Sequence, residues 1–277
     1  KVDTAAIDVD ALDDASDALV DSAIRAEIQR VRDRPTTAPN FRDLTLQAYL
    51  DWRDNQGRPA EGYAKAKTHL DRAFGMNCCD LFALRLRAES SACDCLWAWN
   101  RDTREADAAA ARAVADYLEQ RPDAVALLNL RSKLLIRQGR YDDALQVSDD
   151  VLRREPRSQK ALITRVAALV KLKRLGDAQR AAQPLGGAQS STTAKAVAAA
   201  VQFASGNDSE ALVLAGDVAG RVKPEQWADP TVGRAALTLI AAQSRLDRAE
   251  QAKMTLAQFR SAVPSVKSIA EVKRWLL

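Results

Sequence analysis

The sequence is poor in the residue types on which most enzyme active sites depend. Its 277 residues include one histidine and four cysteines, and aromatic residues make up 5% of the chain. No Gly-x-Ser-x-Gly motif is present, and one imidazole leaves no recognisable Ser-His-Asp arrangement for nucleophilic catalysis. Neighbouring carboxylates such as Asp149 and Asp150 fall on an expected helix surface, where solvation explains them. We therefore expect a protein that is not an enzyme and needs no cofactor.

Long apolar runs and processing signals are also lacking. No run approaches the roughly 18 apolar residues that a membrane-spanning helix needs. No signal peptide is present, and the chain begins with Lys1 instead of Met, which suggests a processed or excised piece. Any membrane attachment would then come from a tether outside this chain.

Strand patterns are scarce, whereas helix-forming residues are abundant. The chain is rich in Ala, Leu and Arg, and it contains only 11 glycines and 9 prolines. The period-two alternation of half-buried strands is rare, so we predict an all-α protein. The chain is too long for one ordinary compact core, but stacked helical repeats can have any length.

The basic excess is small and unevenly distributed. The net charge is +4, although residues 1–22 carry seven aspartates against Lys1, a local sum of about −6. Nucleic-acid binding favours basic residues gathered on one face with aromatic residues between them, and the sequence shows no such grouping. We interpret the basic residues as solvated helix faces and expect no nucleic-acid partner.

Two consecutive segments repeat one pattern at an interval of 34 residues. Tyr141 corresponds to Leu175, and Ala144 corresponds to Ala178. Gly139 stands before the first copy, where a positive φ ends a helix at low cost. The interval and these positions resemble those of the tetratricopeptide (TPR) repeat family, whose units are helix–turn–helix pairs.

The same register extends in both directions and predicts an α-solenoid of about six TPR-like pairs over residues 41–264. A flexible acidic segment (1–16) and an N-terminal helix (17–34) would precede the repeats, and a capping helix (265–277) would follow them. The predicted pairs are 41–54 with 61–74, 80–100 with 105–120, two pairs within 125–185, 193–204 with 209–222, and 232–244 with 246–261. The predicted close-packing residues of the second helices are Ala66, Ala110, Ala144, Ala178, Ala211 and Ala249. In the first helix of the pair that begins at Val125, Leu128 and Ser132 stand where Trp and Gly are usual in the family.

Residues 41–185 also resemble, more narrowly, the TPR regions that follow the catalytic domain of bacterial eukaryotic-like Ser/Thr kinases. Those regions contain a long first helix with a Trp near its end, a polar Arg-Asp joint and an Ala-rich second helix. The matching residues here are Trp97 and Trp99, Arg101-Asp102 and the run Ala106–Ala115. The chain has no kinase Gly-rich loop and no HRD or DFG triplet, so the resemblance implies the repeat-bearing region alone.

The resemblance implies the sensory region of a bacterial receptor Ser/Thr kinase. It would lie in the periplasm as a domain of an inner-membrane protein and act in signal transduction. One alternative is a free-standing TPR adaptor or scaffold in the cytoplasm or periplasm. Another, from a different class, is a small-ligand or metal receptor that uses the cysteine region.

In TPR arrays the first helix of each repeat lines a concave groove. The corresponding positions here predict a mixed basic and apolar groove for an extended or helical protein or peptide segment with some acidic character. The predicted partner-binding residues are Asn129, Lys133, Arg137, Lys160, Ile163 and Lys171. Family members that bind a C-terminal carboxylate have Lys at the position of Asn129 and Asn at the position of Lys133. The order is reversed here, and we therefore do not infer binding of a C-terminal carboxylate. The alternative is that these side chains are solvated and the chain's own acidic N-terminal helix fills the groove.

The cysteines form two close pairs, Cys78-Cys79 and Cys93-x-Cys95. In one continuous helix, the 14 residues between Cys79 and Cys93 would span about 21 Å. A disulfide needs Cα atoms within about 7 Å, and a bridge would therefore require a helix break at Ser90-Ser91. Buried thiols are the first interpretation, and disulfides in an oxidising compartment are the second. A zinc site is the third, because the CC and CxC spacings differ from the usual spacing of zinc ligands. His69 is interpreted as a surface or rim residue, and no metal is expected.

Overall fold

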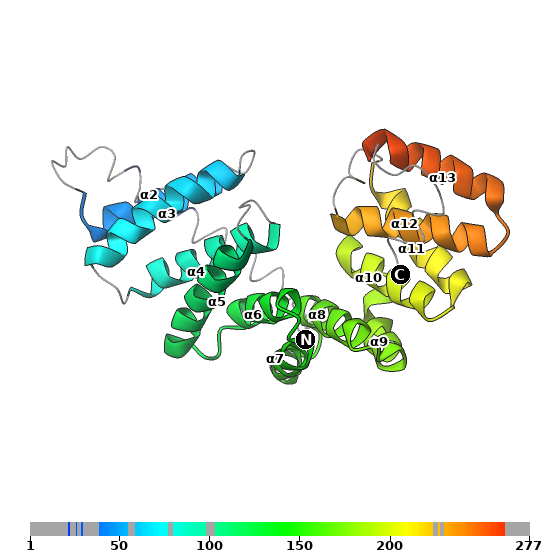
Figure 1. Ribbon diagram of the computed structural model, residues 1–277, viewed down its shortest axis with the longest axis horizontal. Helices are drawn as coiled ribbons and strands as arrows, with labels where there is room; N and C mark the ends of the chain where they lie inside the picture. The colour runs from blue at the N-terminus through cyan, green and yellow to red at the C-terminus, as the bar shows by residue number, and fades with distance from the viewer. Residues whose placement is uncertain are drawn as a thin grey trace, which may run out of the picture. The chain divides into compact units, whose positions relative to one another are not determined.

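A computed structural model describes residues 39–54, 59–76, 80–97, 103–223, 227 and 230–263, together with residues 22, 26 and 29. In these ranges the chain is all-α and contains no strand, which confirms the predicted fold class. The chain divides into two compact units, unit 1 (Lys1–Leu127) and unit 2 (Leu128–Leu277). Figure 1 shows the helices following one another as hairpins within each unit.

Several predicted segments lie outside the described residues. These are the segment 1–16, the capping helix in 265–277 and most of the helix 17–34, of which residues 22, 26 and 29 are described and helical. The domain limits therefore stay predictions. None of the helices in the described part of the chain is both long and apolar enough to cross a membrane.

Unit 1 is built from helix pairs packed on a shared core. Helices α2 (Phe41–Asp54) and α3 (Pro59–Met76) form one pair, and α4 (Leu81–Trp97) and α5 (Thr103–Gln120) form the next. Buried side chains of α2, α3 and α4 form one cluster that includes Leu70, Ala66 and Leu86, so α4 packs on the first pair. The Tyr49 and Phe82 rings, with centroids 6.0 Å apart, link α2 to α4 in the same cluster.

Side-chain caps set where α2 and α4 begin. The Asn40 Oδ1 accepts a hydrogen bond from the Asp43 N–H at 3.0 Å, and the Asn40 N–H donates to Asp43 Oδ2 at 3.0 Å. This reciprocal capping box satisfies two backbone donors at once and makes Asn40 the N-cap of α2. Asp80 caps α4 through its Oδ1, which accepts from the Ala83 N–H at 2.9 Å.

Unit 2 continues the same architecture, and the boundary between the units falls within its first helix. The elements are α6 (Val125–Arg137), α7 (Tyr141–Arg154), α8 (Gln159–Lys171), α9 (Leu175–Ala182), the 3-10 turn η1 (Gln183–Gly186), α10 (Thr192–Ala204), α11 (Asp208–Arg221), α12 (Pro230–Arg245) and α13 (Ala249–Ala262). One buried cluster joins α8, α9, η1 and α10. A second joins residues of α10 to α13 with Trp227. Each helix pair therefore covers the apolar side of its neighbour.

Among the described residues, one turn recurs four times between the two helices of a pair. The residue at the turn has a positive φ: 76° at Gly139, 61° at Lys173, 82° at Gly206 and 56° at Asp247. In all four turns the next residue donates its N–H to the carbonyl five positions earlier, at 2.9 Å, which is the Schellman arrangement. A fully buried alanine follows five positions after each turn residue: Ala144, Ala178, Ala211 and Ala252. The predicted repeat is therefore present as one backbone motif.

The last repeat corrects the predicted register. Ala249 was expected at the close-packing position of a helix over 246–261, but α13 begins at Ala249 and this residue is exposed. Asp247 occupies the left-handed turn position and Arg248 the N-cap, which moves the close-packing position to Ala252. The turn at Asp247 follows Gly206 by 41 residues instead of 34, and a sequence pattern based on a fixed interval misses this insertion.

Candidate partner-binding surface

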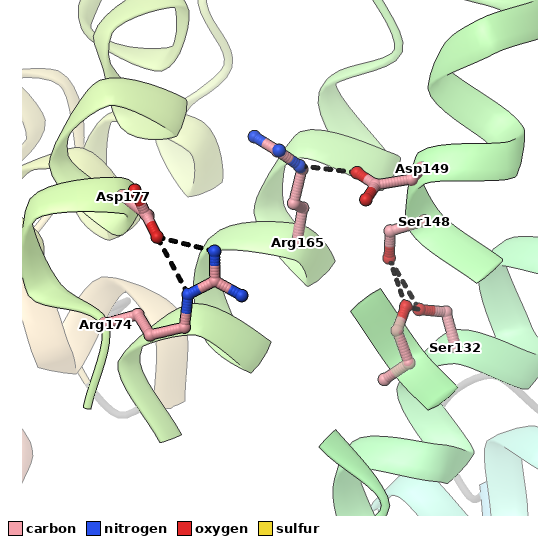
Figure 2. Close-up of polar contacts among 7 residues, drawn as sticks. Ser132, Ser148, Asp149, Arg165, Arg174 and Asp177 are labelled. Carbon is pink, nitrogen blue, oxygen red and sulfur yellow. Dashed lines mark hydrogen bonds and ion pairs between the residues drawn. The ribbon is translucent and has the colours of Figure 1, made fainter. Parts of the chain in front are cut away.

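The pair α6/α7 is held together by small residues at its crossing point. The Ser132 and Ser148 hydroxyls lie 2.7 Å apart, and each lies within hydrogen-bond distance of the Ala144 carbonyl oxygen, at 2.9 and 2.8 Å. Figure 2 shows the two serines facing each other across the helices. All three residues are fully buried. Ser132, which stands where the TPR family usually has Gly, thus meets the same need for a small side chain.

One ion pair joins α8 to α7, and two local ion pairs mark where α7 and α9 begin. Arg165 Nε of α8 donates to Asp149 Oδ1 of α7 at 2.6 Å. Arg174, the N-cap residue of α9, donates to Asp177 at 2.8 Å from Nε and 2.6 Å from a terminal nitrogen (Figure 2). Arg140 and Asp143 make the same contact at the start of α7, at 2.7 Å. The repeated Arg-x-x-Asp pair is therefore part of the turn that begins α7 and α9.

The predicted binding residues lie on α6 and α8, the first helices of consecutive pairs in unit 2. These helices meet in one buried cluster that contains Leu135 of α6, Ala144 of α7 and Ala168 of α8. The basic residues Lys133, Arg137, Lys160 and Lys171 are exposed, and Ile163 is half-buried. Arg137 and Lys171 occupy equivalent positions, 34 residues apart at the ends of their helices.

Asn129 differs from the other five predicted residues. Its side chain is 5% exposed, and its Oδ1 has no hydrogen-bond partner among the described residues. The part of the predicted surface that is open to solvent thus consists of the four basic residues and one edge of Ile163. The contact of all six residues with a partner stays a prediction.

Two carboxylates of unit 2 have their charged forms stabilised by neighbouring cations. The Lys195 ammonium, on a side chain of α10 that is 4% exposed, donates to Asp217 of α11 and lowers the pKa of that carboxyl below its usual range. The Arg174 guanidinium likewise lowers the pKa of Asp177. A folded-state pKa below the unfolded one means that the unfolded chain binds more protons as the pH falls.

We therefore expect unit 2 to lose stability in acid through these two groups. The contribution is fully present above the unfolded carboxyl pKa of about 3.9 and is lost as the pH falls through the lower folded pKa. Urea midpoints measured between pH 6 and pH 2.5 should fall less steeply for Asp217→Asn than for the wild type. Asp142→Asn, at an exposed position of α7, is the matched control. Equal slopes for the wild type and Asp217→Asn would contradict the assignment.

Two of the four cysteines lie in a described helix. Cys93 and Cys95 lie in α4, whereas Cys78 and Cys79 are outside the described residues. Helix α4 runs without a break through Ser90 and Ser91, so the interruption that a bridge between the two pairs requires does not occur. Over the described residues, no group of three or more potential metal ligands is present.

His69 connects the first helix pair. Its Nε2 lies 3.2 Å from Asp51 Oδ2, and the two side chains are 23% and 24% exposed. The histidine of α3 thus occupies a half-buried position at the rim between α2 and α3.

Sequence reasoning missed one feature of unit 1, a cavity between α3, α4 and α5. Its polar lining includes Lys67, Arg87, Arg112 and two aspartates. These residues are separate in the sequence and fall on three helices. In the sequence, these charged residues recur on helix faces that the apolar pattern predicts to be half-buried. The same pattern is expected for a solvated surface, so it does not predict a cavity.

Stacked helix pairs joined by one recurring turn, each followed by a buried alanine, define a TPR-like helical-repeat fold. No protein-family model and no curated protein matches the sequence. Among solved structures the chain is similar to PilW, a widely conserved type IV pilus biogenesis factor, with a TM-score of 0.63 and 16% identity over 83% of this chain and 97% of that one.

Two further solved structures show the same fold. A tetratricopeptide repeat protein from Parabacteroides merdae matches with a TM-score of 0.59 and 15% identity over 97% of this chain and 94% of that one. A thermophilic TPR protein of Thermus thermophilus matches with a TM-score of 0.52 and 18% identity over 71% of this chain and 99% of that one. These similarities confirm the TPR-like prediction at the level of the fold, and none of these three structures is described as part of a kinase.

Proposed function

We propose that the chain is a non-catalytic module that binds an extended or helical segment of a protein partner along α6 and α8. The observation that carries this proposal is the group of exposed cations on the first helices of two consecutive repeats. Arg137 and Lys171 recur at one repeat position, and Lys133 and Lys160 add two further charges.

Apolar side chains lie on the same helices as these cations. Ile136, Ile163 and Val170 are half-buried, so each leaves part of an aliphatic surface open to solvent. A partner segment with acidic and apolar side chains would complement both features, with the apolar contacts supplying affinity and the charges supplying orientation and association rate.

The double substitution Lys133→Glu with Lys171→Glu tests the surface. Peptides of about 15 residues that combine Asp or Glu with Leu or Ile are selected from a displayed library and titrated by fluorescence polarisation. We expect the double variant to bind at least about tenfold more weakly, which corresponds to about 1.4 kcal/mol, because two attractions become repulsions.

The control makes the same charge change elsewhere on neighbouring helices. Arg131→Glu with Arg154→Glu reverses two exposed charges outside the predicted surface, and its affinity should stay within about twofold of the wild type. Unchanged affinity of the Lys133→Glu, Lys171→Glu variant, or no acidic peptide selected at all, would overturn the proposal.

We further propose that this module is the sensory region of a bacterial receptor Ser/Thr kinase and lies in the periplasm. The support is the resemblance of residues 41–185 to the TPR regions of such kinases. An antibody against this chain should then detect a membrane-associated protein larger than 30.2 kDa by at least the mass of a kinase domain. A band at the mass of this chain alone, in the soluble fraction, would exclude this role.

A free-standing adaptor is the second candidate. The observation that favours it is that this chain covers 97%, 94% and 99% of three solved repeat chains, so arrays of this size are crystallised without a kinase domain. The same immunoblot distinguishes the two roles. The number of thiols that titrate in the native protein without reductant then bears on the compartment, because an oxidising compartment favours disulfides.

A further inference from the structure

Unit 1 contains a cavity of about 320 Å³ between α3, α4 and α5. Leu70 of α3 and Ala113 of α5, which are 1% and 3% exposed, form part of an apolar floor. The charged lining consists of Lys67 and Asp71 of α3, Arg87 of α4, and Arg112 and Asp116 of α5. The cavity is within the size range of small-molecule sites, which combine an apolar body with a few placed polar groups.

Arg87 packs on an aromatic ring and keeps one donor without a partner among the described residues. Its guanidinium carbon lies 4.1 Å from the centre of the Phe74 ring, and a terminal nitrogen forms an ion pair with Asp116. The Arg87 Nε is buried and has no hydrogen-bond acceptor among the described residues. A buried donor without an acceptor costs free energy, so the Arg87 guanidinium in the cavity wall is not fully satisfied by its neighbours.

Arg112 supplies a second cation that is not neutralised. Its Nε makes a long hydrogen bond of 3.4 Å to the Ala108 carbonyl of its own helix, and it has no carboxylate partner in the described ranges. Lys67, in contrast, is paired with Asp71 at 2.7 Å, a contact that raises the pKa of the ammonium. Three cations and two carboxylates leave one positive charge in excess in the lining.

We infer that this cavity binds a small organic monocarboxylate with an aliphatic body. The carboxylate accepts hydrogen bonds from the exposed Arg112 and lies beside the guanidinium of Arg87 in the cavity wall, and the aliphatic part lies on Leu70 and Ala113. A single negative charge balances the lining, whereas the neighbouring Asp71 and Asp116 repel a more highly charged anion. The cavity belongs to unit 1, so this inference is independent of the partner-binding surface proposed for unit 2.

The test compares hexanoate with hexanamide, which has almost the same shape and no charge. Each is titrated into the full chain by isothermal calorimetry at constant ionic strength. We expect saturable binding of hexanoate in the millimolar range or tighter, and at least tenfold weaker binding of hexanamide. Equal binding of the two compounds, or no saturable binding of hexanoate, overturns the inference.

Substitutions locate the binding in the cavity. Arg112→Gln removes the excess charge without breaking an ion pair of the described structure, and it should weaken hexanoate binding at least fivefold while the circular dichroism spectrum is unchanged. Lys65→Gln removes one exposed positive charge from α3 outside the cavity lining and should leave the affinity within twofold. Hexanoate binding that Arg112→Gln leaves unchanged would place the ligand elsewhere and overturn the assignment. The Lys133→Glu, Lys171→Glu variant should bind hexanoate as the wild type does, which separates the two proposals.

Discussion

Replacing Gly233 by alanine should destabilise unit 2 by about 1–3 kcal/mol, although it adds a single methyl group. Gly233 lies on the buried side of α12, and a Cβ atom there would come within 2.7 Å of the Trp227 carbonyl oxygen. That oxygen belongs to the main chain and cannot move away by a side-chain rotation. Relief requires α12 or the segment at Trp227 to shift.

Such a shift would disturb the core that surrounds it. Trp227 is 4% exposed, and the centroid of its ring lies 6.0 Å from that of Phe259 of α13. Both rings belong to the cluster that also contains Ile240, which is fully buried. Because packed interiors tolerate small displacements poorly, the strain from one methyl group spreads to α12 and α13 together.

Gly216→Ala provides the matched control, with the opposite expected sign. Gly216 lies inside α11, and a Cβ atom there would meet no atom within 4 Å. Alanine should therefore stabilise the unit by about 0.5–1 kcal/mol through its higher helix propensity. Urea unfolding followed by tryptophan fluorescence measures both effects. A Gly233→Ala variant as stable as the wild type would show that Trp227 does not approach α12 as closely as described.

Periodic features of the fold could be predicted from the sequence because they depend on local physics. The positive φ at Gly139, the small residue at Ala144 and the cap at Asn40 each follow from the preference of one residue for one backbone or packing environment. The turn at Asp247 could not be located by the same reasoning. Aspartate tolerates a positive φ but does not require it, so the residue alone does not mark the turn.

The surface was harder to predict than the fold, because burial depends on several helices at once. Asn129 follows the repeat register, yet neighbouring elements bury it to 5% exposure. The cavity of unit 1 arises where Lys67, Arg87 and Arg112 of three helices face one space. The interval between repeats determines which residues share a helix face, but it does not determine how far two helices stand apart.

Replacing Ser132 by leucine should cause the second large loss of stability. This substitution also tests the packing of α6 on α7, which positions the proposed binding surface. Ser132→Leu places a larger branched side chain in a site with no exposed surface, opposite Ala144 and Ser148. We expect a loss of about 3 kcal/mol in the free energy of unfolding and a decrease in Tm of roughly 6–12 °C, because α6 and α7 must separate to accommodate the side chain.

Smaller substitutions at the same position separate crowding from the loss of the hydroxyl group. Ser132→Gly should cost only about 1 kcal/mol, from the helix propensity of glycine and the lost hydrogen bond, and should keep peptide affinity within twofold. Ser132→Leu should also weaken peptide binding at temperatures where it is still folded, because α6 carries Lys133 and Arg137. Should leucine be tolerated with no loss of stability, α6 and α7 do not cross closely at this point. The equivalence of this pair with the later repeats, and the binding surface inferred from it, would then be wrong.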